Sequence, residues 1–134
     1  MRVLALDYGS ARLGCAISDP TGTVASPLPA IEPPEPRRVA ELVAERGVER
    51  VVVGLPVRLD GTEGEQAAVT RSFCRELEAV LDVGVETYDE RLTTRMALAS
   101  RRAGAAAAED SLAAAHLLES YLASRSAEGG PGER

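Results

Sequence analysis

Lysine and tryptophan are absent from this chain of 134 residues, and its aromatic residues are three tyrosines and one phenylalanine. So few aromatic rings disfavour a single-strand nucleic-acid binder built on base stacking. They also predict a core of valine, leucine and alanine. The two cysteines, Cys15 and Cys74, are too few for a disulfide framework or a metal clip. Cys15 lies in an apolar predicted strand and Cys74 in a predicted helix, and both are expected to be buried free thiols.

Charge and hydropathy narrow the possible classes further. All 15 basic residues are arginine and the net charge is −6, which argues against a broadly basic nucleic-acid-binding surface but leaves room for a local arginine face. The N-terminus runs directly into a predicted strand, and no apolar run is long enough to span a membrane. A cytoplasmic protein without a membrane partner is therefore expected.

The order of apolar runs and turn signals predicts an α/β domain with a mixed sheet. Three strands, over residues 2–7, 12–18 and 23–31, are joined by turns, and Pro27 and Pro29 place the later half of the third at an edge or beyond the ladder. Pro36 then suits the start of a helix that Gly47 ends. The following wholly apolar run, 51–53, is typical of a strand covered on both faces.

The second half of the chain alternates helices with one strand. Thr62 and Glu65 fit a capping box for a helix to about Leu81, whose inward residues would be Val69, Phe73, Leu77 and Val80. A strand over 83–88, a helix from Thr93 or Thr94 to Arg102, and a last helix over 110–124 follow. Residues 125–134 are expected to form a disordered tail.

The most informative residue is Asp7, a carboxylate at the end of an apolar strand and just before the turn Tyr8-Gly9-Ser10. Burying an unpartnered charge is costly, so such a group pairs, protonates or binds a metal. Asp89-Glu90 follows a later strand, and Glu109-Asp110 begins the last helix. Acidic residues at the ends of two predicted strands and at the start of the last helix suggest a divalent-metal site, although Asp7 could simply cap a turn.

Several segments together resemble the YqgF/RuvX family of Holliday-junction-resolvase-like proteins. They are Leu6-Asp7-Tyr8-Gly9-Ser10 with Arg12-Leu13-Gly14, Ala16-Ile17-Ser18-Asp19-Pro20, Val53-Gly54-Leu55-Pro56 with Asp60-Gly61-Thr62, Asp89-Glu90-Arg91-Leu92-Thr93-Thr94, and Asp110 ahead of Ala113-Ala114. They span nearly the whole chain in the family's order. One departure is that Ala105 to Glu109 stand where the family usually has a lysine or arginine before the last aspartate.

The resemblance implies an RNase H-like fold over residues 1–124, with a mixed five-stranded sheet flanked by helices. It implies a metal-dependent nuclease that acts on the 5′ end of pre-16S rRNA or on Holliday junctions and other branched DNA. Asp7, Glu90 and Asp110 would be the catalytic acids that hold Mg²⁺ or Mn²⁺, hard cations that prefer oxygen ligands. Ribosome precursors would be possible partners, and the chain could be a monomer or a homodimer.

Two of these assignments have alternatives in the residues themselves. Asp110 could cap the last helix, where its charge also suits the helix dipole. Asp89 and Glu90 are adjacent at a strand end and point to opposite sides of the sheet, so only one can easily join Asp7. We favour Glu90, with Asp89 as the second choice and otherwise a partner of Arg91.

Several residues near the acids are candidates for nucleic-acid contact. Arg12 and Arg91 lie beside the acids, and Tyr8 is placed to touch a base or sugar. The remaining candidates are Ser10, Arg58, Thr93 and Arg95. The alternative for the arginines is a solvated, salt-bridged surface, while the functional interpretation is a phosphate-binding rim.

Two other classes compete with a nuclease. The Asp-x-Gly-Ser turn after an apolar strand is also similar to the phosphate loop of actin-like and sugar-kinase folds, but those proteins need two such domains to enclose ATP. The other class is a non-catalytic RNA- or ribosome-binding protein on a nuclease fold, because fold alone does not establish activity. A binding protein would not need the acids, and a kinase would bind ATP.

Overall fold

The computed structural model describes the backbone of residues 1–93 and 109–129 and the side chains of residues 1–93 and 111–125. Its strands are β1 (Val3–Tyr8), β2 (Leu13–Ser18), β3 (Ala25–Ile31), β4 (Arg50–Leu55) and β5 (Gly84–Asp89). Its helices are α1 (Pro36–Arg46), α2 (Glu65–Val80) and α4 (Glu109–Gly129), with a single 3₁₀ turn, η1 (Glu90–Leu92), directly after β5.

The strands form one mixed sheet in the order β3-β2-β1-β4-β5, which confirms the predicted fold class. β1 and β2, and β2 and β3, are antiparallel, whereas β4 is parallel to both β1 and β5. β3, with its two prolines, is an edge strand, as expected. Because β1, β4 and β5 run the same way, their carboxyl ends meet at one end of the sheet.

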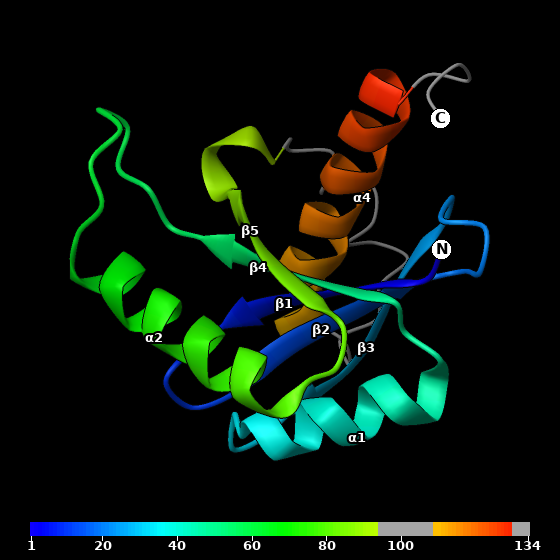
Figure 1. Ribbon diagram of the computed structural model, residues 1–134. Helices are drawn as coiled ribbons and strands as arrows, with labels where there is room; N and C mark the ends of the chain where they lie inside the picture. Colours follow the sequence, from blue (N-terminus) through cyan, green and yellow to red (C-terminus); the bar gives the residue numbers. More distant parts are fainter. Residues whose placement is uncertain (94–108, 130–134) are drawn as a thin grey trace.

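Helices cover both faces of the sheet and create two aliphatic cores (Figure 1). On one face, α1 and α2 pack on alternate residues of β1 and β2, among them Leu4, Leu6 and Cys15. On the other face, α4 packs on the intervening residues Val3 and Ala5, with Ala16 and Val52 beside them. This alternation assigns odd-numbered positions of β1, including Asp7, to the α4 side.

Ser111 fixes the start of α4 against the sheet. Its hydroxyl donates to the Leu28 carbonyl at 2.6 Å and accepts from the Cys15 amide at 3.0 Å. This buried hydroxyl is therefore hydrogen-bonded both as donor and as acceptor. Cys15 lies opposite Leu6 in the sheet, and Gly14 lies opposite Asp7. The first turn of α4 therefore begins beside the end of β1 that carries Asp7.

Two expectations about α2 are wrong. The helix begins at Glu65 with Gly64 as N-cap and no side-chain cap, because the Thr62 hydroxyl is hydrogen-bonded to Asp60 instead. Its buried stripe is Ala67, Thr70, Phe73, Cys74 and Leu77, and this phase leaves Val69 and Val80 exposed. Phe73 and Leu77 are buried as predicted.

Other boundaries shift without changing the fold. β4 begins at Arg50 and continues through Gly54 and Leu55, beyond the predicted run 51–53 at both ends. α4 extends to Gly129, so residues 125–129 of the predicted disordered tail are helical. The predicted helix from Thr93 or Thr94 to Arg102 lies outside the described residues. Both cysteines are buried free thiols, as predicted. Within the described ranges, every helix is too short or too polar to span a membrane.

Candidate active site

Asp7 and Glu90 come together across a glycine on the α4 face of the sheet. The parallel register pairs Leu6 with Val53, so the next position along places Asp7 beside Gly54. Gly54 in turn pairs with Tyr88 of β5, two residues before Glu90. Strand β4, between β1 and β5, thus separates the two acids, and the Glu90 side chain must cross it to reach Asp7.

Gly54 makes that crossing possible because it has no side chain. A Cβ atom at this position would lie 2.8 Å from Glu90 Oε2 and 3.2 Å from Glu90 Cγ. It would also lie 3.3 Å from Leu117 Cδ2 of α4. The space that a side chain would fill on β4 is therefore occupied by the Glu90 carboxylate, held between the sheet and α4.

The two carboxyl groups lie close enough to share a proton, because each perturbs the ionisation of the other. Burial raises the pKa of Asp7 above its usual range. Burial, together with the Asp7 charge and the bond to Asp7, raises the pKa of Glu90 to about 7. Crowded acids of this kind cannot easily both ionise unless a cation joins them.

The Asp89 carboxylate has different partners from the Glu90 carboxylate. Its carboxylate accepts from the Arg91 backbone amide at 2.9 Å, and from Nε and Nη2 of the Arg91 guanidinium at 3.1 and 2.7 Å. These bonds lower the pKa of Asp89, so it is a stable carboxylate in an ion pair. The third guanidinium nitrogen, Arg91 Nη1, donates to the Leu59 carbonyl at 3.3 Å.

The third predicted acid, Asp110, opens α4, which begins one residue earlier at Glu109. Its side chain lies outside the described residues. The contacts of Ser111 nevertheless bring the backbone of this first turn next to Gly14 and Cys15, opposite Asp7 and Leu6. Ala114, Leu117 and Tyr121 lie on the same face of α4 as position 110. All three are buried against the sheet, so this face of the helix faces the sheet.

This donor set fits a hard divalent cation. Among the residues that the structure describes, neither Asp7 nor Glu90 has an ion-pair partner, and no third acid, histidine or cysteine joins them. Two partly buried carboxylates that must share a proton lack the positive charge that would let both ionise. Mg²⁺ and Mn²⁺ supply that charge and take oxygen ligands. His116 is buried on α4, 3.6 Å from Glu119, and lies outside this pair.

The candidate nucleic-acid contacts near the N-terminus differ in their environment. Ser10 and Arg12 are exposed, and Arg12 lies 3.6 Å from the Glu32 carboxylate. Tyr8 is partly buried, with its ring 4.5 Å from that of Phe73, so one face of the ring is covered. Ser10 and Arg12 thus remain accessible to a ligand.

The candidates from the second half of the chain are held by neighbouring groups. Arg58 is exposed and packs against Gly64 at the start of α2. The Thr93 hydroxyl oxygen is buried and has no hydrogen-bond partner within the described residues. Arg95 lies outside them. Arg91, bound to Asp89 and Leu59, is the basic residue nearest in sequence to Glu90 and is largely engaged within the protein.

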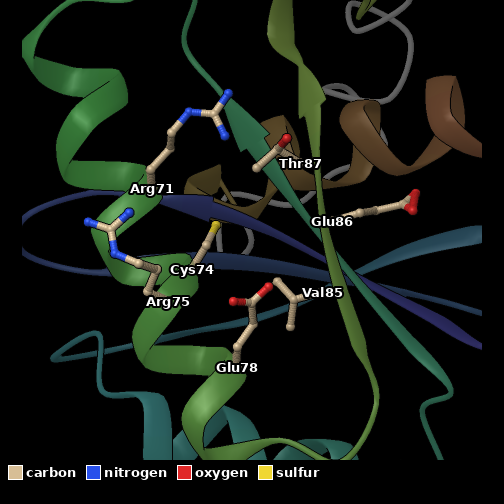
Figure 2. Close-up of a pocket in the computed structure, with 7 residues that line it drawn as sticks. All are labelled: Arg71, Cys74, Arg75, Glu78, Val85, Glu86 and Thr87. Atoms are coloured by element: carbon tan, nitrogen blue, oxygen red, sulfur yellow. The ribbon is translucent and has the colours of Figure 1, made fainter.

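A concave region of about 530 Å³ lies between α2 and the edge strand β5 (Figure 2). Its lining residues are Arg71, Cys74, Arg75, Glu78, Val85, Glu86 and Thr87. Arg71 is paired with Glu63 and Glu86 with Arg50, both at 2.8 Å. Neither Asp7 nor Glu90 lines this region, so it is separate from the carboxyl pair.

Gly54 is a site residue that the sequence arguments did not identify. The predicted strand covers only the apolar run 51–53, and Gly-Leu-Pro follows it directly. The one available signal was a glycine between an apolar strand and a proline, which is also typical of close backbone or ligand approach. Its function as the gap for Glu90 depends on the order of strands in the sheet.

Comparisons with known proteins show the family. A family model described as "RuvX: Holliday junction resolvase" matches residues 1–124. A protein of Chloroflexus aggregans named "Putative pre-16S rRNA nuclease" is 44% identical over 133 residues, covering 92% of this chain and 94% of the relative. A protein of Syntrophus aciditrophicus with the same name is 42% identical over 135 residues, covering 91% and 88%.

Solved structures give the fold. The Thermus thermophilus RuvC structure described as "in complex with Holliday junction substrate" has a TM-score of 0.63 and 18% identity, covering 99% of this chain and 98% of RuvC. A second T. thermophilus RuvC structure has a TM-score of 0.53 and 17% identity, covering 92% and 96%. The predicted RNase H-like fold is confirmed.

Proposed function

The chain belongs to the RuvX Holliday junction resolvase family, and from this premise we propose that it is a nuclease that hydrolyses structured nucleic acid with Mg²⁺ or Mn²⁺. The observation that carries the proposal is that the Asp7 and Glu90 carboxyl groups meet at Gly54, on the face covered by α4. Nothing in the folding of the sheet requires two acids to meet there, and their crowding opposes folding. A catalytic metal site accounts for that cost.

Asp7, Glu90 and Asp110 would hold the cation, and the cation when bound would supply an activated water and stabilise the leaving oxygen. Asp7 and Glu90 would release their shared proton on binding and become two charged ligands. Gly54 keeps the path between them open because it has no side chain. Asp89 and Arg91 form an ion pair that fixes the backbone of η1, and Glu90 is the first residue of that turn.

The substrate we propose is precursor rRNA, with processing at the 5′ end of pre-16S rRNA in the cytoplasm. The names of the relatives in C. aggregans and S. aciditrophicus support this choice. Branched DNA is the second candidate, favoured by the description of the family model. For either substrate, Arg12 and Arg91 would contact phosphates beside the acids.

The test is a panel of labelled precursor rRNA, four-way DNA junctions and linear duplexes, incubated with Mg²⁺, Mn²⁺ or chelator. We expect metal-dependent cleavage of at least the precursor RNA or the junction. Glu90→Gln should abolish it, whereas Asp89→Asn, which disrupts only the pair with Arg91, should retain much of it. A greater loss from Asp89→Asn would reverse the assignment of the two acids. ATP binding without cleavage would instead favour a phosphotransferase, and metal-independent binding without cleavage a non-catalytic RNA-binding protein.

A further inference from the structure

Ser120 links the last helix to the turn that carries Glu90. Its hydroxyl donates to the Leu92 carbonyl at 2.9 Å, and Leu92 is the last residue of η1. The same oxygen lies 2.9 Å from the Tyr88 hydroxyl. Since the single proton of Ser120 already points to a carbonyl, which can only accept, the Tyr88 hydroxyl must donate to Ser120. The three groups therefore form one directed chain, from Tyr88 through Ser120 to the backbone of the turn.

Both ends of this chain adjoin the candidate site. Tyr88 is the residue of β5 that pairs with Gly54, where the Glu90 carboxylate crosses β4. Its ring lies edge-on to that of Tyr121 of α4, with ring centres 5.8 Å apart. At the other end, Leu92 belongs to the same three-residue turn as Glu90. A turn this short gains little stability from its own hydrogen bonds, so its position depends on the elements that hold it.

The bonds of η1 show which elements those are. The Thr93 amide donates to the Glu90 carbonyl at 3.1 Å, a bond between the turn and its own C-cap. Within the described part of the chain, η1 is hydrogen-bonded to the loop after β4 through Arg91, which donates to the Leu59 carbonyl, and to α4 through Ser120. The Ser120 bond therefore sets the distance between the turn and α4.

A second serine fixes the other end of the same helix. Ser111 is bonded to β2 and β3, through the Cys15 amide and the Leu28 carbonyl. Ser120 follows Ser111 by nine positions, which is about two and a half helical turns, or roughly 13.5 Å along the axis. The two hydroxyls therefore lie on opposite flanks of α4, one toward the β3 edge of the sheet and the other toward the β5 edge.

These directional contacts matter because the apolar packing of α4 leaves its register loosely specified. Hydrophobic contact has no preferred direction, and alanines present no side chain long enough to lock into the sheet. The buried stripe of the helix consists of Ala114, Ala115, Leu117, Leu118 and Tyr121. One serine on each flank fixes the helix in both rotation and translation, and the turn with Glu90 is fixed together with it.

We propose that Ser120 is a positioning residue of the metal site: with Tyr88, it holds the turn that carries Glu90 against α4, so that the Glu90 carboxylate stays at Gly54 and faces Asp7. This inference rests on the proposed metal-dependent function. Two carboxylates that bind one cation repel each other before it arrives, and a turn free to move would let Glu90 swing toward water. Groups that orient metal ligands from behind typically contribute about 10- to 100-fold to metal affinity.

The test compares Ser120→Ala with Ser124→Ala, in chelator and with Mn²⁺. Ser124 is the matched control because it lies one turn further along the same flank of α4, and its hydroxyl donates to the Tyr121 carbonyl of its own helix at 3.0 Å. Amide hydrogen exchange followed by NMR reports on the turn directly, through the Thr93 amide that is bonded to the Glu90 carbonyl. Calorimetric titration with Mn²⁺ reports on the metal ligands.

We expect Ser120→Ala, in chelator, to speed exchange of the Thr93 amide about tenfold. Exchange of the Val52 amide, in the buried centre of the sheet, should not change. The Kd for Mn²⁺ should rise about tenfold. Ser120→Thr, which keeps the hydroxyl, should restore both values, and Tyr88→Phe, which removes only the donor to Ser120, should give intermediate values. Ser124→Ala should behave as wild type.

Three outcomes would overturn the inference. Unchanged exchange at Thr93 in Ser120→Ala would show that the bond does not hold the turn. Equal acceleration at Thr93 and Val52 would make Ser120 an ordinary contributor to stability. Local acceleration with an unchanged Kd for Mn²⁺ would show that the position of the turn does not affect the site. Failure of the proposed function looks different, because the wild type itself would then bind no Mn²⁺.

Discussion

Replacing Glu90 with glutamine should stabilise the metal-free protein at neutral and alkaline pH. Glu90 ionises at about pH 7 instead of the 4.5 of a free glutamate, so the folded state holds its proton more tightly than the unfolded state. This contribution to stability is complete below pH 4.5 and is lost as the pH rises through 7. Glutamine keeps the shape and can donate to Asp7 without titrating.

The shift in pKa sets the size of the effect. A change from 4.5 to about 7 corresponds to roughly 3 kcal/mol at 1.36 kcal/mol per pH unit. Glu90 is partly exposed, and screening by solvent reduces the expected value to about 1.5 kcal/mol. For a domain of this length, that difference raises the melting temperature by about 5 °C.

The assay is thermal and urea unfolding in chelator between pH 5 and 8.5. The wild type should lose stability relative to Glu90→Gln over this range, with the largest difference at the alkaline end. Glu41→Gln, on the exposed side of α1, is the control for a general change in charge. Parallel stability curves for wild type and Glu90→Gln would refute the argument that the two acids are crowded together.

Two more predictions concern the geometry and the charge of the site. Gly54→Ala should lower the cleavage rate about a hundredfold by displacing the Glu90 carboxylate, with little loss of stability because that side chain can move. Gly84→Ala is the control, because a Cβ atom at Gly84 would meet nothing within 4 Å. Equal activity of both variants would contradict the role of Gly54. Arg12→Ala should reduce the log-log salt slope of nucleic-acid binding by about 1. An unchanged slope would mean that Arg12 belongs to the solvated surface.

Much of the fold could be predicted because local patterns decide it. Apolar runs of strand length, the early turns and Gly47 placed all five strands and α1 within a few residues. The phase of α2 could not be predicted from its capping box, since Asp60 competes for the Thr62 hydroxyl and the N-cap lies two residues later, at Gly64.

Some residues of the candidate site could also be predicted from the sequence, and others could not. Asp7, Asp89 and Glu90 stood out as acids at strand ends, because the cost of burying charge makes such positions informative in any sequence. Gly54 did not stand out, because its role exists only once β4 lies between β1 and β5. The tie between Arg91 and the Leu59 carbonyl joins residues 32 positions apart and has no local signal.

The most direct test of the metal site is calorimetric titration of Mn²⁺ into the wild type, Asp7→Asn and Asp110→Asn proteins, followed by melting with and without the metal. We predict that the wild type binds Mn²⁺ and that a hundredfold excess over Kd stabilises it by about 2.7 kcal/mol. Both variants should lose most of the heat and most of the stabilisation. Equal binding and equal stabilisation of all three proteins would contradict a shared metal site and favour a protein that binds nucleic acid without cutting it.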